Sequence, residues 1–209
     1  MKKALIILLT VFLTQLTFGQ SMDELLKMWN SETVRIGDSE KERIDSEIKD
    51  LKPIEKVLIS TSYSNGKLKI YSHNQSIRKL DKTYTLSDTT FSESYYFMGR
   101  WPLYVEIEHS NQKSPDKFYF DKTNLMLWID SNQDEFTVEN EKCSKWWWNL
   151  AESMDKLMMI ANSESGQVNE DEIKLPDPPP MSKEDSLKMI ELKKQFDELM
   201  KTVPDSLKK

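Results

Sequence analysis

Cysteine, histidine and glycine are scarce in this chain, whose 209 residues include one cysteine, two histidines and five glycines. The single cysteine, Cys143, excludes a disulfide within the chain, so a packed core must hold the fold together. His73 and His109 have no neighbouring cysteine and no regularly spaced partner, so the sequence indicates no zinc site. There is no glycine-rich phosphate loop and no Gly-x-Ser-x-Gly motif. These absences leave no catalytic motif, and we expect no cofactor.

Long apolar runs are absent after the first 20 residues. Residues 1–19 have the three parts of a secretory signal peptide: two lysines, an apolar run over 4–13, and small residues at Thr17 and Gly19 before a cleavage site. The apolar stretch would span about 22 Å as a helix, less than the roughly 30 Å of a bilayer core. We therefore expect cleavage after Gly19, a periplasmic or secreted protein, and no transmembrane helix after cleavage.

Basic residues are outnumbered by acidic ones, 29 against 35, which gives a net charge of −6. Loss of the two lysines of the signal segment changes this charge to −8. Such acidity argues against a nucleic-acid partner, because the phosphate backbone repels it. A protein or glycan of the bacterial envelope is the expected kind of partner.

Apolar residues at helical spacing predict three helices in an α+β domain over residues 20–161. The first two are expected at 22–30 and 39–52, with Gly37 in the interruption between them. The third is expected at 142–161, where apolar residues repeat at intervals of three and four.

Between the second and third helices, short β-branched and aromatic runs are separated by turn residues. This pattern predicts an antiparallel β-meander of about six strands over 57–130. Residues 101–108 alternate, which predicts one core face and one wet face of the sheet. The expected core residues of that strand are Trp101, Leu103, Val105 and Ile107. The helices should flank the meander and cover its core face.

The C-terminal part of the chain differs in composition. Residues 162–181 are rich in proline and acidic side chains, which predicts a flexible linker. Residues 182–203 are expected to form a C-terminal helix with an apolar stripe. That stripe contains Met189, Leu192, Phe196, Leu199 and Val203. Such a helix can dock on its own domain or be offered to a partner.

Two segments look like copies of one hairpin unit, which begins with Tyr95-Tyr96-Phe97 in the first copy and Phe118-Tyr119-Phe120 in the second. In each, an aromatic run is followed by a polar turn and an apolar strand, and the second copy ends in Leu-Met-Leu-Trp-Ile-Asp. The units resemble the hairpins of MORN-like repeats and are similar to those of small exported bacterial proteins of uncharacterised function. The resemblance implies no catalytic residues. The second copy has Lys122-Thr123 in place of the turn glycine, which leaves the strand register there open.

Aromatic side chains supply the candidate binding residues. Three successive helical positions point about 100° apart, so the tryptophans at 146–148 cannot all face one core. Two of the three serve as core anchors in the simpler interpretation, whereas a stacking surface for sugar or peptide is the functional one. Aromatic residues of the sheet could form a second stripe, for which cross-strand pairing or cover by the C-terminal helix is the alternative. The candidates are Trp146, Trp148, Tyr104, Tyr119 and Trp128.

A run of oxygen-bearing residues after the last predicted strand resembles a calcium loop in spacing. The candidate ligands are Asp130, Asn132, Asp134 and Glu141. Glu135, however, occupies the position where the sharp bend of such a loop needs glycine. A polar turn is the simpler interpretation.

Two functions remain open from the sequence. The first is an exported, non-enzymatic binding or scaffold module of the envelope. The second is a carboxylate-based hydrolase or sugar-processing enzyme, which would need a concave site with convergent acids.

Overall fold

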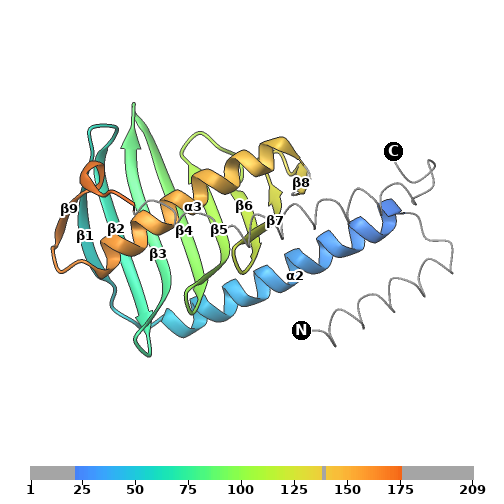
Figure 1. Cartoon of the computed structure of the whole chain (residues 1–209), viewed down its shortest axis with the longest axis horizontal. Helices are drawn as coiled ribbons and strands as arrows, with labels where there is room; N and C mark the ends of the chain where they lie inside the picture. Colours follow the sequence, from blue (N-terminus) through green and yellow to red (C-terminus); the bar gives the residue numbers. More distant parts are fainter. Residues whose placement is uncertain (1–21, 138–139, 176–209) are drawn as a thin grey trace, which may run out of the picture. The chain divides into compact units, whose positions relative to one another are not determined.

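The computed structural model describes residues 22–137 and 140–175 (Figure 1). Residues 28–175 form one compact unit, and residues 22–27 are the only described part of the other. The predicted signal peptide, the C-terminal helix at 182–203 and the last part of the predicted linker lie outside the described residues.

A single sheet of nine strands forms the centre of the fold, in the order β8-β7-β6-β5-β4-β3-β2-β1-β9. Its strands are β1 Ile54–Ile59, β2 Ser64–His73, β3 Ser76–Leu86, β4 Thr89–Met98, β5 Trp101–His109, β6 Asp116–Asp121, β7 Asn124–Ile129, β8 Glu135–Thr137 and β9 Gln167–Asn169. Strands β1 to β8 pair with their sequence neighbours in antiparallel fashion, whereas β9 pairs with β1 in parallel. The predicted α+β class and antiparallel meander are confirmed, but the predicted number of six strands is too low. Two of the additional strands, β8 and β9, have three residues each, too few to show an alternating pattern.

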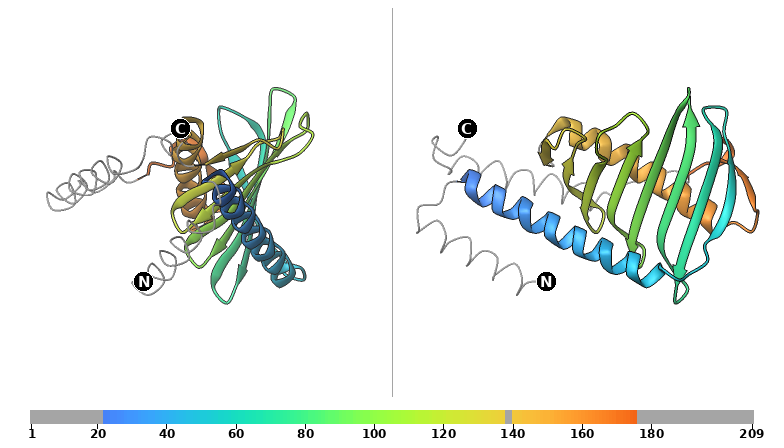
Figure 2. Two further views of the ribbon diagram at one scale, coloured as in Figure 1. Left: turned by 90° about the vertical axis from the view of Figure 1, so that its right-hand side faces the viewer. Right: turned by 180° about the vertical axis from the view of Figure 1, so that it is seen from behind.

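Helices cover both faces of the sheet (Figures 1 and 2). Helix α3, Glu141–Asn162, packs on one face, and α2, Met22–Ile48, lies against the other; a 3-10 turn, Glu170–Glu172, follows β9. The α3 side contains the larger hydrophobic cluster, which includes Leu80, Phe118 and Leu157. The α2 side contains a second cluster. The expectation of one core face and one wet face is therefore wrong.

Helix α2 is one continuous helix where the sequence predicts two, at 22–30 and 39–52. Gly37 lies within it and is buried. A Cβ atom at this position would lie 2.4 Å from Cδ1 of Tyr119. The glycine therefore allows the tyrosine ring of β6 to approach the helix backbone closely, which is one of the ordinary uses of glycine in a packed element. The third helix is confirmed, one residue longer at each end than the predicted 142–161.

The β4–β5 and β6–β7 hairpins, which correspond to the two similar sequence units, share their irregularities. Both registers shift after the central tyrosine, between Tyr96 and Phe97 and between Tyr119 and Phe120. The turn residues Gly99 and Lys122 both have left-handed backbones, with φ of 65° and 57°. Lys122 thus adopts the left-handed conformation at the position where the first unit has glycine.

The register shift in β5 divides its expected core residues between the two faces. Tyr96 pairs with Tyr104 and Phe97 with Pro102, which leaves Leu103 as the extra residue of a bulge. Leu103 consequently packs with the α2-side cluster, whereas Val105 and Ile107 contact the α3-side cluster. The prediction that Leu103 shares a face with Val105 and Ile107 is wrong, because alternation has a strict period of two only where the ladder is regular.

Candidate functional site

Three tyrosines lie side by side on the α2 face of the sheet, one on each of β4, β5 and β6. Tyr104 is the direct cross-strand partner of both Tyr96 and Tyr119. Ring centroids are 5.6 Å apart for the first pair and 5.2 Å apart for the second, both in edge-to-face geometry. All three side chains are buried. We call Tyr96, Tyr104 and Tyr119 the tyrosine row.

Each hydroxyl of the tyrosine row donates a hydrogen bond to a carboxylate. Tyr96 bonds to Asp45 at 3.3 Å, Tyr104 to Glu106 at 2.7 Å, and Tyr119 to Asp38 at 3.1 Å. Burial, followed by the charge of the paired carboxylate, raises the pKa of each hydroxyl well above its usual value. The phenols therefore stay protonated and keep the three carboxylates in place.

Asp45 is held between two lysines at the end of this row. Lys41 Nζ lies 2.9 Å from Oδ2 of Asp45, and Lys79 Nζ lies 3.4 Å from Oδ1. Lys79 also lies over the ring of Tyr96, 4.8 Å from its centroid. Burial alone would raise the pKa of Asp45, but the hydrogen bond from Lys41 and the charge of Lys79 outweigh it and lower this pKa.

The variant Asp45→Asn is expected to reduce the acid sensitivity of the protein. A carboxyl group with a lowered folded-state pKa stabilises the fold above its unfolded value of about 3.8, and this contribution is lost as the pH falls through the folded value. The variant should be less stable than the parent at pH 7 by about 1 kcal/mol, since the site is partly exposed to solvent. This difference should shrink below about pH 4. Urea unfolding at pH 7 and pH 3 measures it, with exposed Asp50→Asn as the control. A difference that does not depend on pH would contradict the assigned role.

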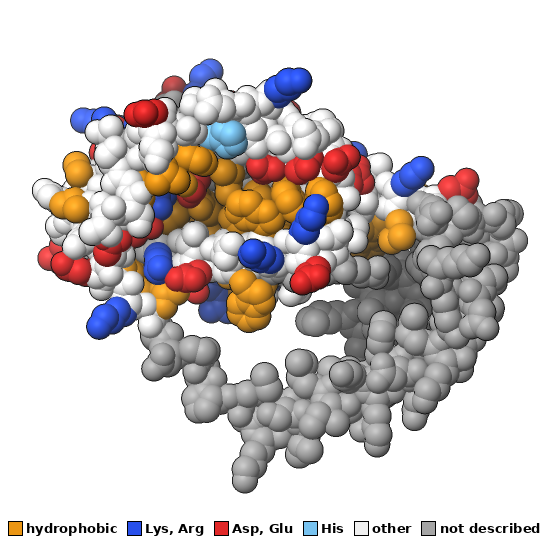
Figure 3. Space-filling view, turned by 90° about the horizontal axis from the view of Figure 1, so that it is seen from above, with side chains coloured by type: hydrophobic (Ala, Val, Ile, Leu, Met, Phe, Trp, Pro, Cys, Tyr) orange, Lys and Arg blue, Asp and Glu red, His pale blue; other side chains and the backbone are white. Residues whose placement is uncertain are grey.

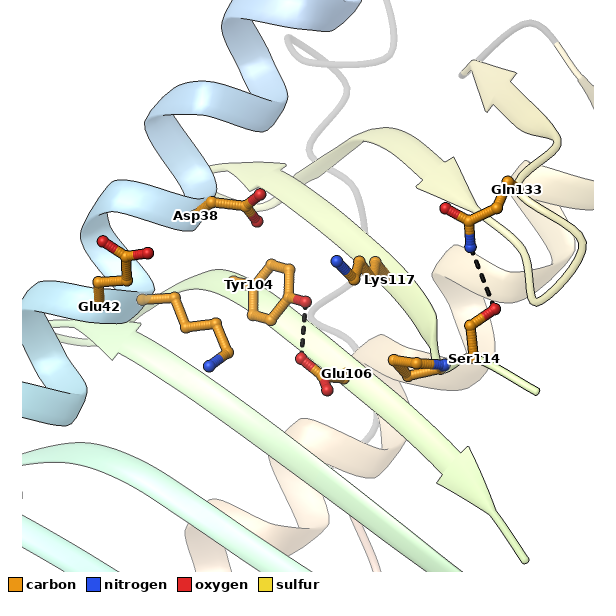
Figure 4. Close-up of a pocket in the computed structure, with 9 residues that line it drawn as sticks. Asp38, Glu42, Tyr104, Glu106, Ser114, Lys117 and Gln133 are labelled. Carbon is orange, nitrogen blue, oxygen red and sulfur yellow. Dashed lines mark hydrogen bonds between the residues drawn. The ribbon is translucent and has the colours of Figure 1, made fainter. Parts of the chain in front are cut away.

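A polar pocket of about 600 Å³ opens beside the tyrosine row, between α2 and strands β5 and β6 (Figure 4). Its lining residues come from α2, β5, β6, the loop before β6 and the β7–β8 turn. They are Asp38, Lys41, Glu42, Tyr104, Glu106, Ser114, Pro115, Lys117 and Gln133. We call this cavity the α2 pocket. Three carboxylates and two lysines converge on it, so its wall is mainly charged.

Some polar groups of the α2 pocket are committed to internal hydrogen bonds and others are not. Glu106 accepts from Tyr104, and Gln133 donates to Ser114 at 3.1 Å. The side chains of Lys117 and Glu42, in contrast, make no hydrogen bond or ion pair with any residue of 22–137 or 140–175. Figure 4 shows Lys117 extending beside the Tyr104–Glu106 pair. The pocket therefore has a half-buried ammonium group and several carboxylate oxygens available to a ligand.

A second polar network lies on the opposite face of the sheet. The buried carboxylate of Glu93 accepts hydrogen bonds from Tyr84 at 2.9 Å and Tyr95 at 2.7 Å. Lys82 donates to Glu170 at 2.8 Å, and its ammonium lies 5.0 Å from the ring centroid of Tyr84. These groups pair with one another, which is the arrangement that makes buried charge tolerable in a core. We assign this network a structural role.

Hydrophobic side chains also gather in a hollow on the face of the molecule seen in Figure 3, with charged side chains at its margin. On the α3 side of the sheet, Tyr84 stacks on Phe91 at 5.1 Å, and Phe91 contacts His109 at 5.3 Å. Nδ1 of His109 is buried without a hydrogen-bond partner among the described residues. Because these rings contact one another, they do not offer free faces for stacking.

The tryptophans at 146–148 have three different environments. Trp146 packs against Phe118 at 5.3 Å and Trp128 at 5.8 Å, inside the α3-side cluster. Trp147 donates to the carbonyl of Thr123 at 2.7 Å and also contacts this cluster. Trp148 is 67% exposed. Two of the three are thus core residues, and Trp148 is the candidate that solvent can reach.

The predicted stripe of Tyr104, Tyr119 and Trp128 is divided between the two faces. Tyr104 and Tyr119 belong to the α2-side cluster, whereas Trp128 stacks on Phe118 in the α3-side cluster. Tyr104 and Tyr119 are direct cross-strand partners, which was the alternative to a binding stripe.

The calcium candidates lie in a turn that closes on itself. Oδ1 of Asp130 accepts hydrogen bonds from the backbone N–H groups of Asn132 and Asp134, both at 2.9 Å. Glu141 begins α3 and is exposed. No group of three or more acidic, histidine or cysteine side chains is placed to hold a metal within the described ranges. These hydrogen bonds are those of a polar turn, the simpler interpretation of this run.

Cys143 is buried at the start of α3. Its burial raises the pKa of the thiol to about 11. The thiol is therefore protonated at neutral pH and is a poor nucleophile.

Known proteins give no further guidance. Comparisons with protein families, curated proteins and solved structures find no significant match. Within the described residues, no helix combines the length and apolar character that crossing a bilayer requires.

The sequence candidates include Tyr104 but none of the helix and loop residues that line the α2 pocket. Asp38 and Glu42 are four residues apart, a spacing that places them on one side of a helix. The sequence gives no such signal here, because Gly37 predicts an interruption between two helices just before these residues. Lys117 gave no signal of its own, since a lysine in a strand usually points to solvent.

Proposed function

We propose that the chain is an exported, non-enzymatic binding module of the bacterial envelope and that the α2 pocket is its binding site. The proposal rests on one observation: carboxylates and an ammonium group that can still form hydrogen bonds converge in one cavity. The signal-like N-terminus supports export. The partner classes expected from composition are protein and glycan.

The hydrogen bonds of the pocket acids favour a recognition surface. Glu106 accepts a hydrogen bond from the Tyr104 hydroxyl, and Asp38 accepts one from the Tyr119 hydroxyl. Each of these carboxylates is thereby held in a fixed orientation and keeps a further oxygen for a ligand. Carboxylates are strong hydrogen-bond acceptors, which suits binding of a polar molecule.

The alternative is a carboxylate-based hydrolase or sugar-processing enzyme. The observation in its favour is that Asp38, Glu42 and Glu106 line the same pocket. An enzyme converts the bound molecule to a product, whereas a binding module releases it unchanged.

A retention and turnover experiment tests the proposed function. The protein is recovered from the periplasm or medium of expressing cells, with an N-terminus expected at Gln20, and is incubated with protein and glycan fractions of a bacterial envelope. We expect saturable retention of one fraction, without new reducing ends or peptide products after prolonged incubation. A product that accumulates with time and enzyme concentration would establish the enzymatic alternative, and absence of any retention would contradict the binding function.

A further inference from the structure

We propose that the α2 pocket binds a neutral, hydroxyl-rich ligand, a sugar unit of a glycan. The inference rests on the proposed binding function and specifies the chemistry of the ligand. It is drawn from the hydrogen-bonding groups of the wall, its net charge, its few apolar surfaces and its position on the sheet.

The charged groups of the wall are of two kinds, those that only accept hydrogen bonds and those that only donate them. Carboxylates such as Glu42 and Glu106 accept, whereas the ammonium of Lys117 donates and cannot accept. A hydroxyl group donates through its hydrogen and accepts through its lone pairs. Neighbouring hydroxyls of a sugar can therefore satisfy both kinds of group at once.

Charge excludes a strongly anionic ligand. Three carboxylates line the pocket, and only two lysines oppose them. Of these, Lys41 already pairs with Asp45. An acidic ligand would have Lys117 as its only uncommitted cation in the described wall and would be repelled by the nearby carboxylates. A neutral ligand avoids this repulsion.

The position of the pocket disfavours an extended peptide. Peptides commonly bind by adding a strand to a sheet edge, with apolar pockets for alternate side chains. The α2 pocket lies over β5 and β6, and each of these strands already pairs with a neighbour on both sides. Its only ring-bearing lining residues are Tyr104 and Pro115, which leaves no apolar pocket for a side chain. The volume of about 600 Å³ is that of an ordinary small-molecule site.

Two substitutions remove opposite kinds of recognition group while keeping side-chain size. Glu106→Gln keeps a carbonyl oxygen that can accept from Tyr104 but removes the negative charge. Lys117→Met removes the donor and keeps the aliphatic length. The matched control is Glu108→Gln, two residues further along β5 on the same face, exposed and outside the pocket lining.

The experiment titrates the full exported protein and its variants with defined probes and follows backbone amide signals by NMR. The neutral probes are glucose, galactose, mannose and N-acetylglucosamine, with glucuronate as the anionic probe and triglycine as the peptide probe. We expect saturable shifts at the α2 pocket with at least one neutral sugar and weaker binding of glucuronate. Glu106→Gln and Lys117→Met should each weaken sugar binding about tenfold or more, the loss expected for a charged hydrogen-bond partner. Glu108→Gln should bind as the parent does, and thermal unfolding establishes that each variant is folded.

The contrary outcomes separate this inference from the proposed function. Shifts with triglycine and none with any sugar would overturn the sugar ligand and leave a binding module. Sugar binding that is equal in the parent, Glu106→Gln and Lys117→Met would place the site elsewhere and overturn the pocket assignment. If none of the probes binds while an envelope fraction is still retained, the sugar inference fails and the binding function stands. If retention is also absent, both fail.

Discussion

Replacing Gly37 by alanine is expected to destabilise the protein by about 2 kcal/mol, as for other overpacked cores. Helix propensity alone predicts that the substitution stabilises the protein, since alanine is favoured over glycine inside a helix by about 1 kcal/mol. The structure decides between them, because the new methyl group would lie 2.4 Å from Cδ1 of Tyr119. That ring cannot move aside freely, since it is buried and its hydroxyl bonds to Asp38 on the same helix.

Urea unfolding of Gly37→Ala measures this loss, and Gly166→Ala is the matched control. A Cβ at Gly166 meets no atom within 4 Å, so the control should be neutral or slightly stabilising. The substitution Tyr119→Ala removes the obstructing ring. The double variant Gly37→Ala/Tyr119→Ala should therefore have a higher free energy of unfolding than Tyr119→Ala alone. A parent-like or higher stability of the single variant Gly37→Ala would show that the helix and sheet are less tightly packed than described.

Trp146→Ala and Trp148→Ala are expected to have very different effects, although the two residues are of one type and lie two positions apart. Trp146 contacts the rings of both Phe118 and Trp128. Its truncation should cost about 3 kcal/mol, the lower end for a large aromatic side chain because Trp146 is not fully buried. Trp148 is 67% exposed, and its truncation should change stability by less than about 0.5 kcal/mol.

Thermal and urea unfolding of the two variants provide the comparison, and each serves as the control for the other. Equal losses of stability would contradict the assignment of Trp146 to the core and Trp148 to the surface. Because Trp148→Ala is expected to fold as the parent does, it also tests whether Trp148 forms a stacking surface for sugar. Sugar titrations that are unchanged in this variant would exclude Trp148 as the recognition element.

Local patterns predicted the elements of the fold better than their packing. The helix at 142–161 and the antiparallel meander could be predicted because periodicity and turn residues depend on neighbours in sequence. The continuity of α2 was not readable, since a glycine inside a helix and a glycine at its end look alike until the ring of Tyr119 is placed beside Gly37. The bulge at Leu103 had the same effect on the sheet, because one inserted residue moves side chains to the other face.

The candidate site was less predictable than the fold. Aromatic type makes Tyr104 and Tyr119 candidates in the sequence, but their partners, Glu106 and Asp38, have no distinguishing sequence pattern. The α2 pocket brings together Asp38, Lys117 and Gln133 from a helix, a strand and a turn. Only the tertiary structure places such residues together, and a single sequence contains no measure of that proximity.

The parallel pairing of β9 with β1 constrains the order in which the chain can fold. These strands lie at one end of the sheet, and Lys56 of β1 donates to the carbonyl of Ser163, 107 positions further along the chain. Contacts of such long range form late, because the entropy of closing the loop is recovered only after the intervening elements are in place. Until then β1 is an open sheet edge with exposed Val57 and Ile59, the kind of edge that promotes aggregation. A chain threaded through a membrane from its N-terminus would complete this edge only after residues 167–169 had emerged, so sealing of the sheet would be among the last steps of its maturation.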